Sequence, residues 1–150
     1  MQVDISIERA PGAQFDQGGL FVRFDSETWI KTGIEVVDDR PKLGCVVTNE
    51  FSDWSTQDWG SLSVRLRISQ MGDGAYVIEA QSTDADPVSD AWFFIRICQL
   101  RGIDTSEGAQ TQVSVGIFAC CPENQVNMRV NFSRFSILPG TKFLHNADGN

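Results

Sequence analysis

Two glutamates, Glu35 and Glu79, are the residues of this sequence best suited to acid–base chemistry. Each lies in an apolar, strand-like run and falls between the residues that would face a core. Glycoside hydrolysis uses such a pair, because one carboxyl group must be protonated and the other ionised at a fixed separation. The two glutamates are therefore the candidate catalytic residues, on the condition that the protein is an enzyme.

Aromatic and charged side chains fall in the same non-core registers, and together they are typical of a ligand-binding surface. A flat ring covers the apolar CH face of a sugar, while charged groups bond its hydroxyls. Tryptophan is uncommon on an exposed sheet face, so Trp29 and Trp92 favour a groove. The alternative is a solvated outer face with ordinary cross-strand ion pairs. The candidate ligand-binding residues are Arg23, Trp29, Lys31, Glu35, Asp53, Trp54, Arg65, Arg67, Trp92 and Arg96.

The run Ser52-Asp53-Trp54-Ser55 lies within residues 51–60, which we expect to form an aromatic and polar loop. This loop could form a rim over the groove. In the alternative, its serine and aspartate side chains cap backbone amides while Trp54 packs down onto the domain. Both interpretations stay open from the sequence.

Metal-ligating residues are scarce, and we expect neither a metal nor a cofactor. The sequence has four cysteines, no CxxC pair and one histidine, His145. A zinc site needs such ligands in clusters. Asp84, Asp86 and Asp90 could offer oxygen ligands to calcium, but their run lacks the glycine and glutamate of an EF-hand. We therefore expect a solvated loop there.

The elements that must position these residues are β-strands. Apolar and polar residues alternate in short runs between turn residues, which is typical of strands whose side chains point to opposite faces. No amphipathic helix is predicted. Eight or nine strands follow one another, as in an all-β sandwich or barrel. The runs are residues 3–7, 20–25, 29–36, 41–48, 61–69, 75–81, 91–100, 113–121 and 128–138.

Length and charge narrow the classes of protein. The chain has 150 residues, a net charge of -8 and a pI of about 4.5. Nucleic acid and anionic membranes are poor partners for such a chain, because both need a basic face. No apolar run approaches the roughly 20 residues of a membrane span, and the N-terminus has no signal-peptide pattern. We expect a cytoplasmic protein with one domain, residues 1–140, and a flexible tail, residues 141–150.

Two segments carry a resemblance to a known family. The first reads FDQGGLFVRFDSETWIKTGIE and is followed by VVTNEFSDWS, and the second reads GIFACCPENQVNMRVNFSRFSI. Over roughly residues 4–138 the chain resembles the regulation-of-enolase-protein-like family, a domain of unknown function. The resemblance implies an antiparallel two-sheet jelly-roll sandwich of the concanavalin A-like kind. Family members usually carry a longer N-terminal segment, so edge strands could be missing here, and an exposed sheet edge could pair with a second copy as a homodimer.

Sandwiches of this type include lectins, glycan-binding modules and glycoside hydrolases, so the fold alone does not set the function. The ExDxxE run of many hydrolases of this fold is absent. We therefore expect non-hydrolytic binding of a small, carbohydrate-like ligand in the concave groove. Two alternatives stay open. One is a cofactor-independent isomerase or cyclase acting on an apolar molecule in the same groove. The other is a regulatory module that binds a protein partner.

Overall fold

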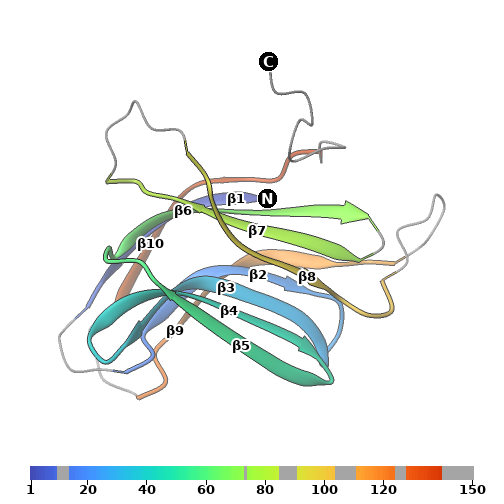
Figure 1. The fold of residues 1–150 in the computed structure, drawn as a ribbon, viewed down its shortest axis with the longest axis horizontal. Helices are drawn as coiled ribbons and strands as arrows, with labels where there is room; N and C mark the ends of the chain where they lie inside the picture. The colour runs from blue at the N-terminus through green and yellow to red at the C-terminus, as the bar shows by residue number, and fades with distance from the viewer. Residues whose placement is uncertain (10–13, 73, 85–90, 104–110, 124–127, 140–150) are drawn as a thin grey trace.

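The described residues of the computed structural model form ten β-strands and no helix (Figure 1). These residues are 1–9, 14–72, 74–84, 91–103, 111–123 and 128–139. No helix that could cross a membrane occurs among them. The strands are β1 (Gln2–Glu8), β2 (Gln17–Arg23), β3 (Thr28–Val37), β4 (Arg40–Asn49), β5 (Phe51–Asp58), β6 (Ser63–Gly72), β7 (Ala75–Gln81), β8 (Phe93–Gln99), β9 (Ser114–Cys120) and β10 (Arg129–Ser136).

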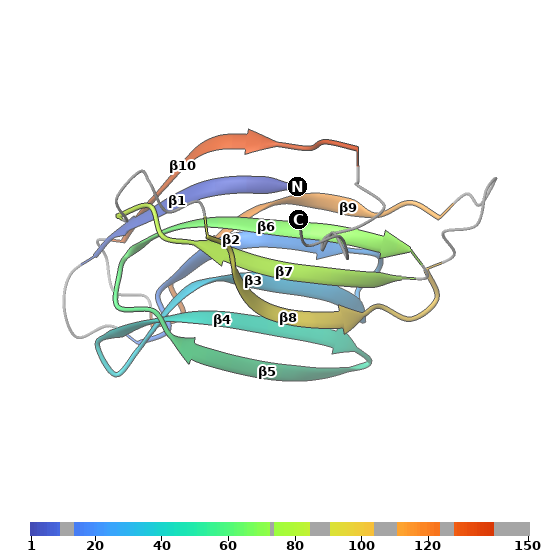
Figure 2. The same cartoon turned by 45° about the horizontal axis from the view of Figure 1, so that its top comes forward.

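The strands form two antiparallel sheets that lie face to face (Figures 1 and 2). One sheet has the order β10-β1-β6-β7-β8, and we call it the β6 sheet after its central strand. The other has the order β5-β4-β3-β2-β9, and we call it the β3 sheet. The N-terminal strand β1 is an inner strand, because it pairs with both β10 and β6. The two-sheet, all-β sandwich predicted from the sequence is confirmed.

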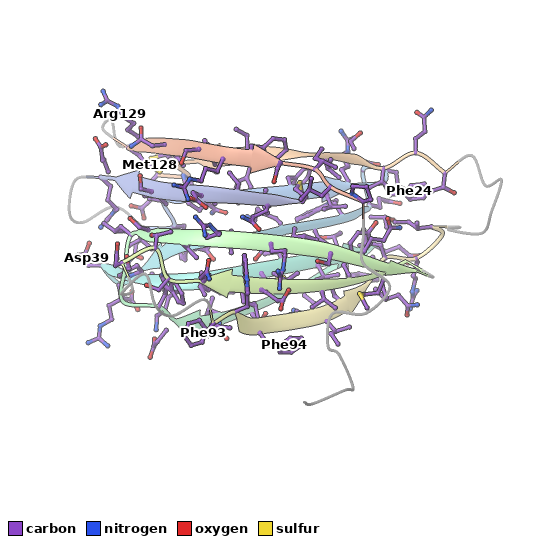
Figure 3. The ribbon with its side chains drawn as sticks, turned by 90° about the horizontal axis from the view of Figure 1, so that it is seen from above. Phe24, Asp39, Phe93, Phe94, Met128 and Arg129 are labelled. Atoms are coloured by element: carbon purple, nitrogen blue, oxygen red, sulfur yellow. The ribbon has the colours of Figure 1, made fainter. Side chains whose placement is uncertain are left out.

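Alternation along the strands builds one core between the two sheets. Alternate residues of a strand point to the same face, so one set from each strand is removed from water. Leu20, Ile30 and Leu66 are fully buried members of this set. The intervening residues form two outer faces, one on each sheet. Figure 3 places Phe93 and Phe94 along β8, which is the edge strand of the β6 sheet opposite to β10.

Residues 51–58 form strand β5, and the predicted loop is therefore wrong. β5 pairs with β4 from Lys42 opposite Asp58 to Asn49 opposite Phe51. The strand is an edge of its sheet, and almost all of its side chains are exposed. Polar residues therefore occupy both of its faces, and no apolar alternation marks it in the sequence. Trp54 consequently lies on a sheet and not on a rim loop.

Some of the sequence predictions concern residues outside the described part of the chain. The expected tail, residues 141–150, is one of these, and Asp86, Asp90 and His145 are others. Asp84 is described, and it accepts a hydrogen bond from the Ser61 hydroxyl at 2.6 Å. Within the described residues, that carboxylate therefore joins the segment before β6 to the segment after β7.

Candidate functional site

The predicted site residues lie in three separate regions of the structure. The outer face of the β3 sheet carries Arg23, Trp29, Lys31, Glu35 and Trp54. The outer face of the β6 sheet carries Arg65, Arg67, Glu79 and Trp92. The margin between the sheets holds Asp53 and Arg96. The two outer faces point away from each other, so the residues do not share one groove.

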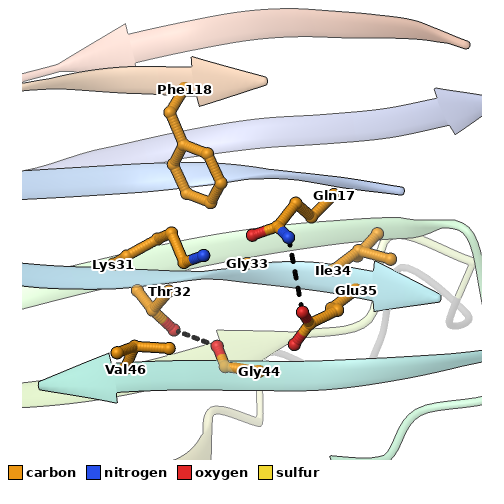
Figure 4. Close-up of a pocket in the computed structure, with 9 residues that line it drawn as sticks. All are labelled: Gln17, Lys31, Thr32, Gly33, Ile34, Glu35, Gly44, Val46 and Phe118. Atoms are coloured by element: carbon orange, nitrogen blue, oxygen red, sulfur yellow. Dashed lines mark hydrogen bonds between the residues drawn. The ribbon is translucent and has the colours of Figure 1, made fainter. Parts of the chain in front are cut away.

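Glu35 is the centre of the arrangement on the β3 sheet. It is only 8% exposed, although it lies on the outer face of β3. The side-chain amide of Gln17 on β2 donates to its Oε1 at 3.3 Å, as Figure 4 shows. The indole Nε1 of Trp54 on β5 donates to its Oε2 at 3.0 Å. Both carboxylate oxygens therefore have a neutral donor, and the group is held in one position as an acceptor.

A strip without side chains lies beside Glu35. Gly19, Gly33 and Gly44 are in register across β2, β3 and β4. A Cβ atom at position 33 would lie 2.1 Å from the carbonyl oxygen of Gly18, and one at position 44 would lie 2.7 Å from Oε2 of Glu35. Glycine is therefore required where the strands and the carboxylate approach closely. The strip forms a shallow hollow with a free volume of about 10 Å³, which is room for about one water molecule.

Aromatic rings flank the glycine strip. Phe21 and Trp29 contact each other with ring centroids 5.7 Å apart. The Lys31 ammonium lies 5.7 Å from the centroid of the Phe118 ring, which projects from β9. Trp54 is 51% exposed although its indole is anchored on Glu35. The face thus combines exposed ring surface, a fixed carboxylate and an ammonium group, which are the groups that bind polyhydroxylated molecules.

Charges on the outer face of the β6 sheet bond to each other. Arg65 donates to both carboxylate oxygens of Asp4, at 2.6 and 2.9 Å, and to Gln81 at 2.9 Å. Arg67 donates to Glu79 at 2.7 Å. The Arg67 guanidinium also lies 3.9 Å from the ring centroid of Trp92. A side chain within this network is held by its neighbours across the strands.

Asp53 and Arg96 tie the margins of the two sheets together. Arg96 on β8 bonds to the Asp53 carboxylate and, at 3.1 Å, to the Ser55 hydroxyl on β5. Close by, the Asn49 side-chain amide donates to the Gln99 carbonyl oxygen at 2.8 Å. The Arg96 contacts join β8 and β5, which are edge strands of different sheets, and the Asn49 contact joins β4 to β8. Their geometry fits a structural tie and does not place them on either outer face.

The two candidate catalytic carboxylates, Glu35 and Glu79, lie on opposite outer faces. Sheets packed face to face are about 10 Å apart, and these side chains point away from the space between them. The pair needed for hydrolysis therefore does not form. Glu35 pairs with Lys42 on β4, and Lys42 pairs in turn with Asp58 on β5. A hydrogen bond from Lys42 lowers the pKa of Asp58, so this second carboxylate stays ionised.

The two buried thiols and the acidic residues do not form a reactive centre within the described residues. No group of three or more His, Cys, Asp or Glu side chains there could hold a metal ion. Cys45 and Cys98 are buried free thiols. Burial raises the pKa of Cys45 to about 12 and that of Cys98 to about 11. Both remain protonated at neutral pH, which makes them poor nucleophiles.

Sequence reasoning missed several residues of the Glu35 face. They are Gln17, Gly19, Phe21, Gly33, Gly44 and Phe118. Strand alternation already assigns Gly33 to the face of Glu35, and pairing the two hairpins would have aligned the three glycines. Phe118 has no such local signal. It joins the face only because β9 pairs with β2, almost 100 residues earlier in the chain.

Comparison with known protein families identifies the family of this chain. Residues 1–139 match the family described as "Protein of unknown function (DUF1349)". The chain belongs to this family. It is 33% identical to the protein named Regulation of enolase protein 1 from Saccharomyces cerevisiae over 134 residues, which are 87% of this chain and 61% of the relative. An uncharacterised protein from Emericella nidulans is 27% identical over 89 residues, which are 54% of this chain and 44% of that protein.

Several solved structures have a similar fold and agree with the sandwich. A functionally unknown protein from Saccharomyces cerevisiae has a TM-score of 0.69 at 27% identity, covering 90% of this chain and 66% of its own. The GH43 protein BlXynB from Bacillus licheniformis has a TM-score of 0.61 at 11% identity. A xylan beta-1,4-xylosidase from Bacillus halodurans has a TM-score of 0.63 at 14% identity. The last two matches cover 87% of this chain but 26% of theirs, and they show the fold alone.

Proposed function

We propose that the outer face of the β3 sheet binds a carbohydrate-like ligand without hydrolysing it. The observation that carries this proposal is the Glu35 carboxylate, which is buried on an outer face and held there by Gln17 and Trp54. Burial of a carboxylate is costly unless it is hydrogen-bonded, so its position is well defined. A ligand hydroxyl therefore meets an acceptor that needs no rearrangement.

The surroundings of Glu35 suit a chain of sugars more than a single enclosed ring. The hollow above Gly33 and Gly44 is shallow, but the glycine strip crosses three strands. Trp54 lies at the β5 side of this strip, and Phe118 lies at the β9 side. Aromatic side chains at both sides supply stacking surface for successive sugar rings, while Glu35 supplies hydrogen bonds between them.

Binding without hydrolysis follows from the carboxylates of this face. Among the described residues, Glu79 cannot share a glycosidic bond with Glu35, because it lies on the outer face of the other sheet. Asp58 is bonded to Lys42 and is kept ionised by it, so it cannot serve as the protonated acid. The usual glycosidase mechanisms need one protonated carboxylic acid and one ionised carboxylate on either side of the scissile bond.

Xylo-oligosaccharides are the first ligands to test. Two structures of similar fold are a GH43 protein and a xylan beta-1,4-xylosidase. Isothermal titration with xylohexaose, within a panel of neutral and acidic oligosaccharides, measures whether any of these ligands binds. We expect a saturable ligand in this panel and no release of new reducing ends.

Trp54→Ala and Trp92→Ala form a matched pair for the same titration. Trp54→Ala removes an exposed ring and the donor to Glu35, so we expect affinity to fall at least about tenfold, or ~1.4 kcal/mol. Trp92→Ala removes a ring of the same kind from the opposite sheet and should leave affinity unchanged. An equal loss in both variants, or no binding anywhere in the panel, would contradict the proposal.

A further inference from the structure

A second hollow lies inside one end of the sandwich, away from the Glu35 face. Its volume is about 530 Å³, which is within the range of small-molecule sites. It opens where β2 and β6 end and where β7 and β9 begin, beside the segment that follows β10. Its wall is mainly apolar and includes Val22, Ile68, Val113, Val115, Ile137 and Leu138. We call this hollow the Tyr76 cavity, after the one tyrosine in its wall.

The apolar wall is incompletely covered within the described residues. Val22 and Ile68 are buried, as core residues should be. Val115 faces Val22 across the β2–β9 pair, yet it is 41% exposed, and Leu138 is 72% exposed. Apolar side chains that gather around a hollow in this way mark a binding site more often than a plain surface.

Tyr76 gives the cavity a hydrogen-bond donor on the inner face of β7, in a wall that also includes Gln2, Arg67, Ser69, Gln70 and Ser136. Tyr76 is only 4% exposed. Its hydroxyl has no hydrogen-bond partner among the described residues, and it is not among the polar atoms sealed from water. Burial raises the pKa of the phenol, so the hydroxyl keeps its proton. Because the hydroxyl is open to the hollow, a ligand acceptor placed there can take its hydrogen bond in place of solvent.

We infer that the Tyr76 cavity binds an apolar small molecule that carries one neutral hydrogen-bond acceptor, such as a ketone or ester oxygen. The apolar body lies against Val22, Ile68 and Val115, and the acceptor takes the proton of the Tyr76 hydroxyl. A negatively charged ligand is less suitable. Two cationic groups reach the wall, but both are engaged. Glu79 bonds the Arg67 guanidinium at 2.7 Å, and the Met1 ammonium donates to the Ile68 carbonyl oxygen at 2.9 Å. This site is independent of the sugar-binding face, since it lies between the sheets.

Prodan, a naphthalene fluorophore with one ketone, is a direct probe of this cavity. Titration into the wild-type protein should give saturable, blue-shifted emission. Tyr76→Phe keeps the ring and removes the hydroxyl, so we expect binding about fivefold weaker, the value of one hydrogen bond. Unchanged affinity in Tyr76→Phe would overturn the assigned role of the hydroxyl, and the absence of saturable binding to the wild type would overturn the site.

Substitutions that fill the Tyr76 cavity test whether prodan binds there. Val115→Trp and Ile137→Trp each place a large ring at a half-exposed position of the wall and should weaken prodan binding at least tenfold. Ile97→Trp is the control, because Ile97 is 62% exposed on the outer face of β8 and should have no effect. Thermal melting establishes that each variant folds. The site is refuted by equal binding in plugged and control variants, or by wild-type binding that falls as protein concentration rises, since a second copy would then cover the wall.

Discussion

The outer faces of the two sheets carry polar side chains at corresponding strand positions, but they hold them in different ways. On the β6 sheet, Arg65 and Arg67 bond to carboxylates on neighbouring strands. On the β3 sheet, the buried carboxylate of Glu35 bonds to two neutral donors and lies beside glycines and exposed rings. The first face resembles a set of cross-strand ion pairs, and the second resembles a surface prepared for a ligand.

The difference shows why a list of polar residues does not identify a site. A charge with a partner of opposite sign across the strands contributes to the sheet itself. A fixed carboxylate beside exposed aromatic rings has capacity left for another molecule. Trp92 illustrates the point, since it stacks on Arg67, whereas Trp54 presents half of its surface to solvent. The predictions below test this contrast, in order of decreasing effect.

Gly33→Ala should produce the largest effect on stability. A methyl group there would meet the backbone of β2 at 2.1 Å, so two strands of the β3 sheet would have to move apart. We expect the free energy of unfolding in urea to fall by about 3 kcal/mol, the upper end for overpacking. Xylohexaose affinity should fall as well, because the glycine strip would be disturbed.

Gly116→Ala is the matched control for this substitution. Gly116 lies opposite Phe21 on the same outer face, and a methyl group there would meet nothing within 4 Å. The free energy of unfolding of the Gly116→Ala variant should therefore differ from that of the wild type by less than about 0.5 kcal/mol. If Gly33→Ala were as well tolerated as Gly116→Ala, the close approach of β2 and β3 would not constrain the face.

Glu79→Gln and Glu35→Gln compare how much one carboxylate on each outer face contributes to the free energy of unfolding. Glu79→Gln removes a charge from a hydrogen bond with Arg67, and we expect a loss of about 2 kcal/mol in urea unfolding at low salt. Glu35→Gln keeps one acceptor for its two neutral donors, and we expect a loss of about 1 kcal/mol.

Salt separates the two substitutions further. Repeating both measurements in 1 M potassium chloride should reduce the effect of Glu79→Gln, because ion pairs are screened. The effect of Glu35→Gln should not change, because neither of its donors is charged. A salt response of the same size in both variants would mean that the two faces do not differ in the way described.

Much of the fold could be predicted from the sequence, because alternation is a local property. The period of two places Glu35 and Lys31 on one face of β3 and Ile34 on the other. The β2–β3 hairpin also brings Arg23 opposite Trp29, as the predicted site required. Strand β5 was missed because an edge strand needs no apolar face.

The grouping of the candidate residues could not be predicted in the same way. Alternation says which residues of a strand share a face, but not which sheet the strand joins. Arg65 in β6 and Glu35 in β3 each alternate with core residues of their strand. Long-range pairing nevertheless puts the two strands in different sheets, so the two side chains lie on opposite outer faces. Arg96 shows a further case, since it reaches from β8 to β5 between the sheets. These outcomes depend on contacts between distant segments, which no local pattern contains.

An NMR titration tests the central claim most directly. Proton–nitrogen correlation spectra recorded as xylohexaose is added report every backbone amide and the indole of Trp54. We predict the largest shifts at the Trp54 indole and at the amides of Gly19, Gly33 and Gly44, which lie along the β3 sheet. Shifts concentrated instead on the amides of the β6 sheet, around Arg65, Arg67 and Glu79, would contradict the account.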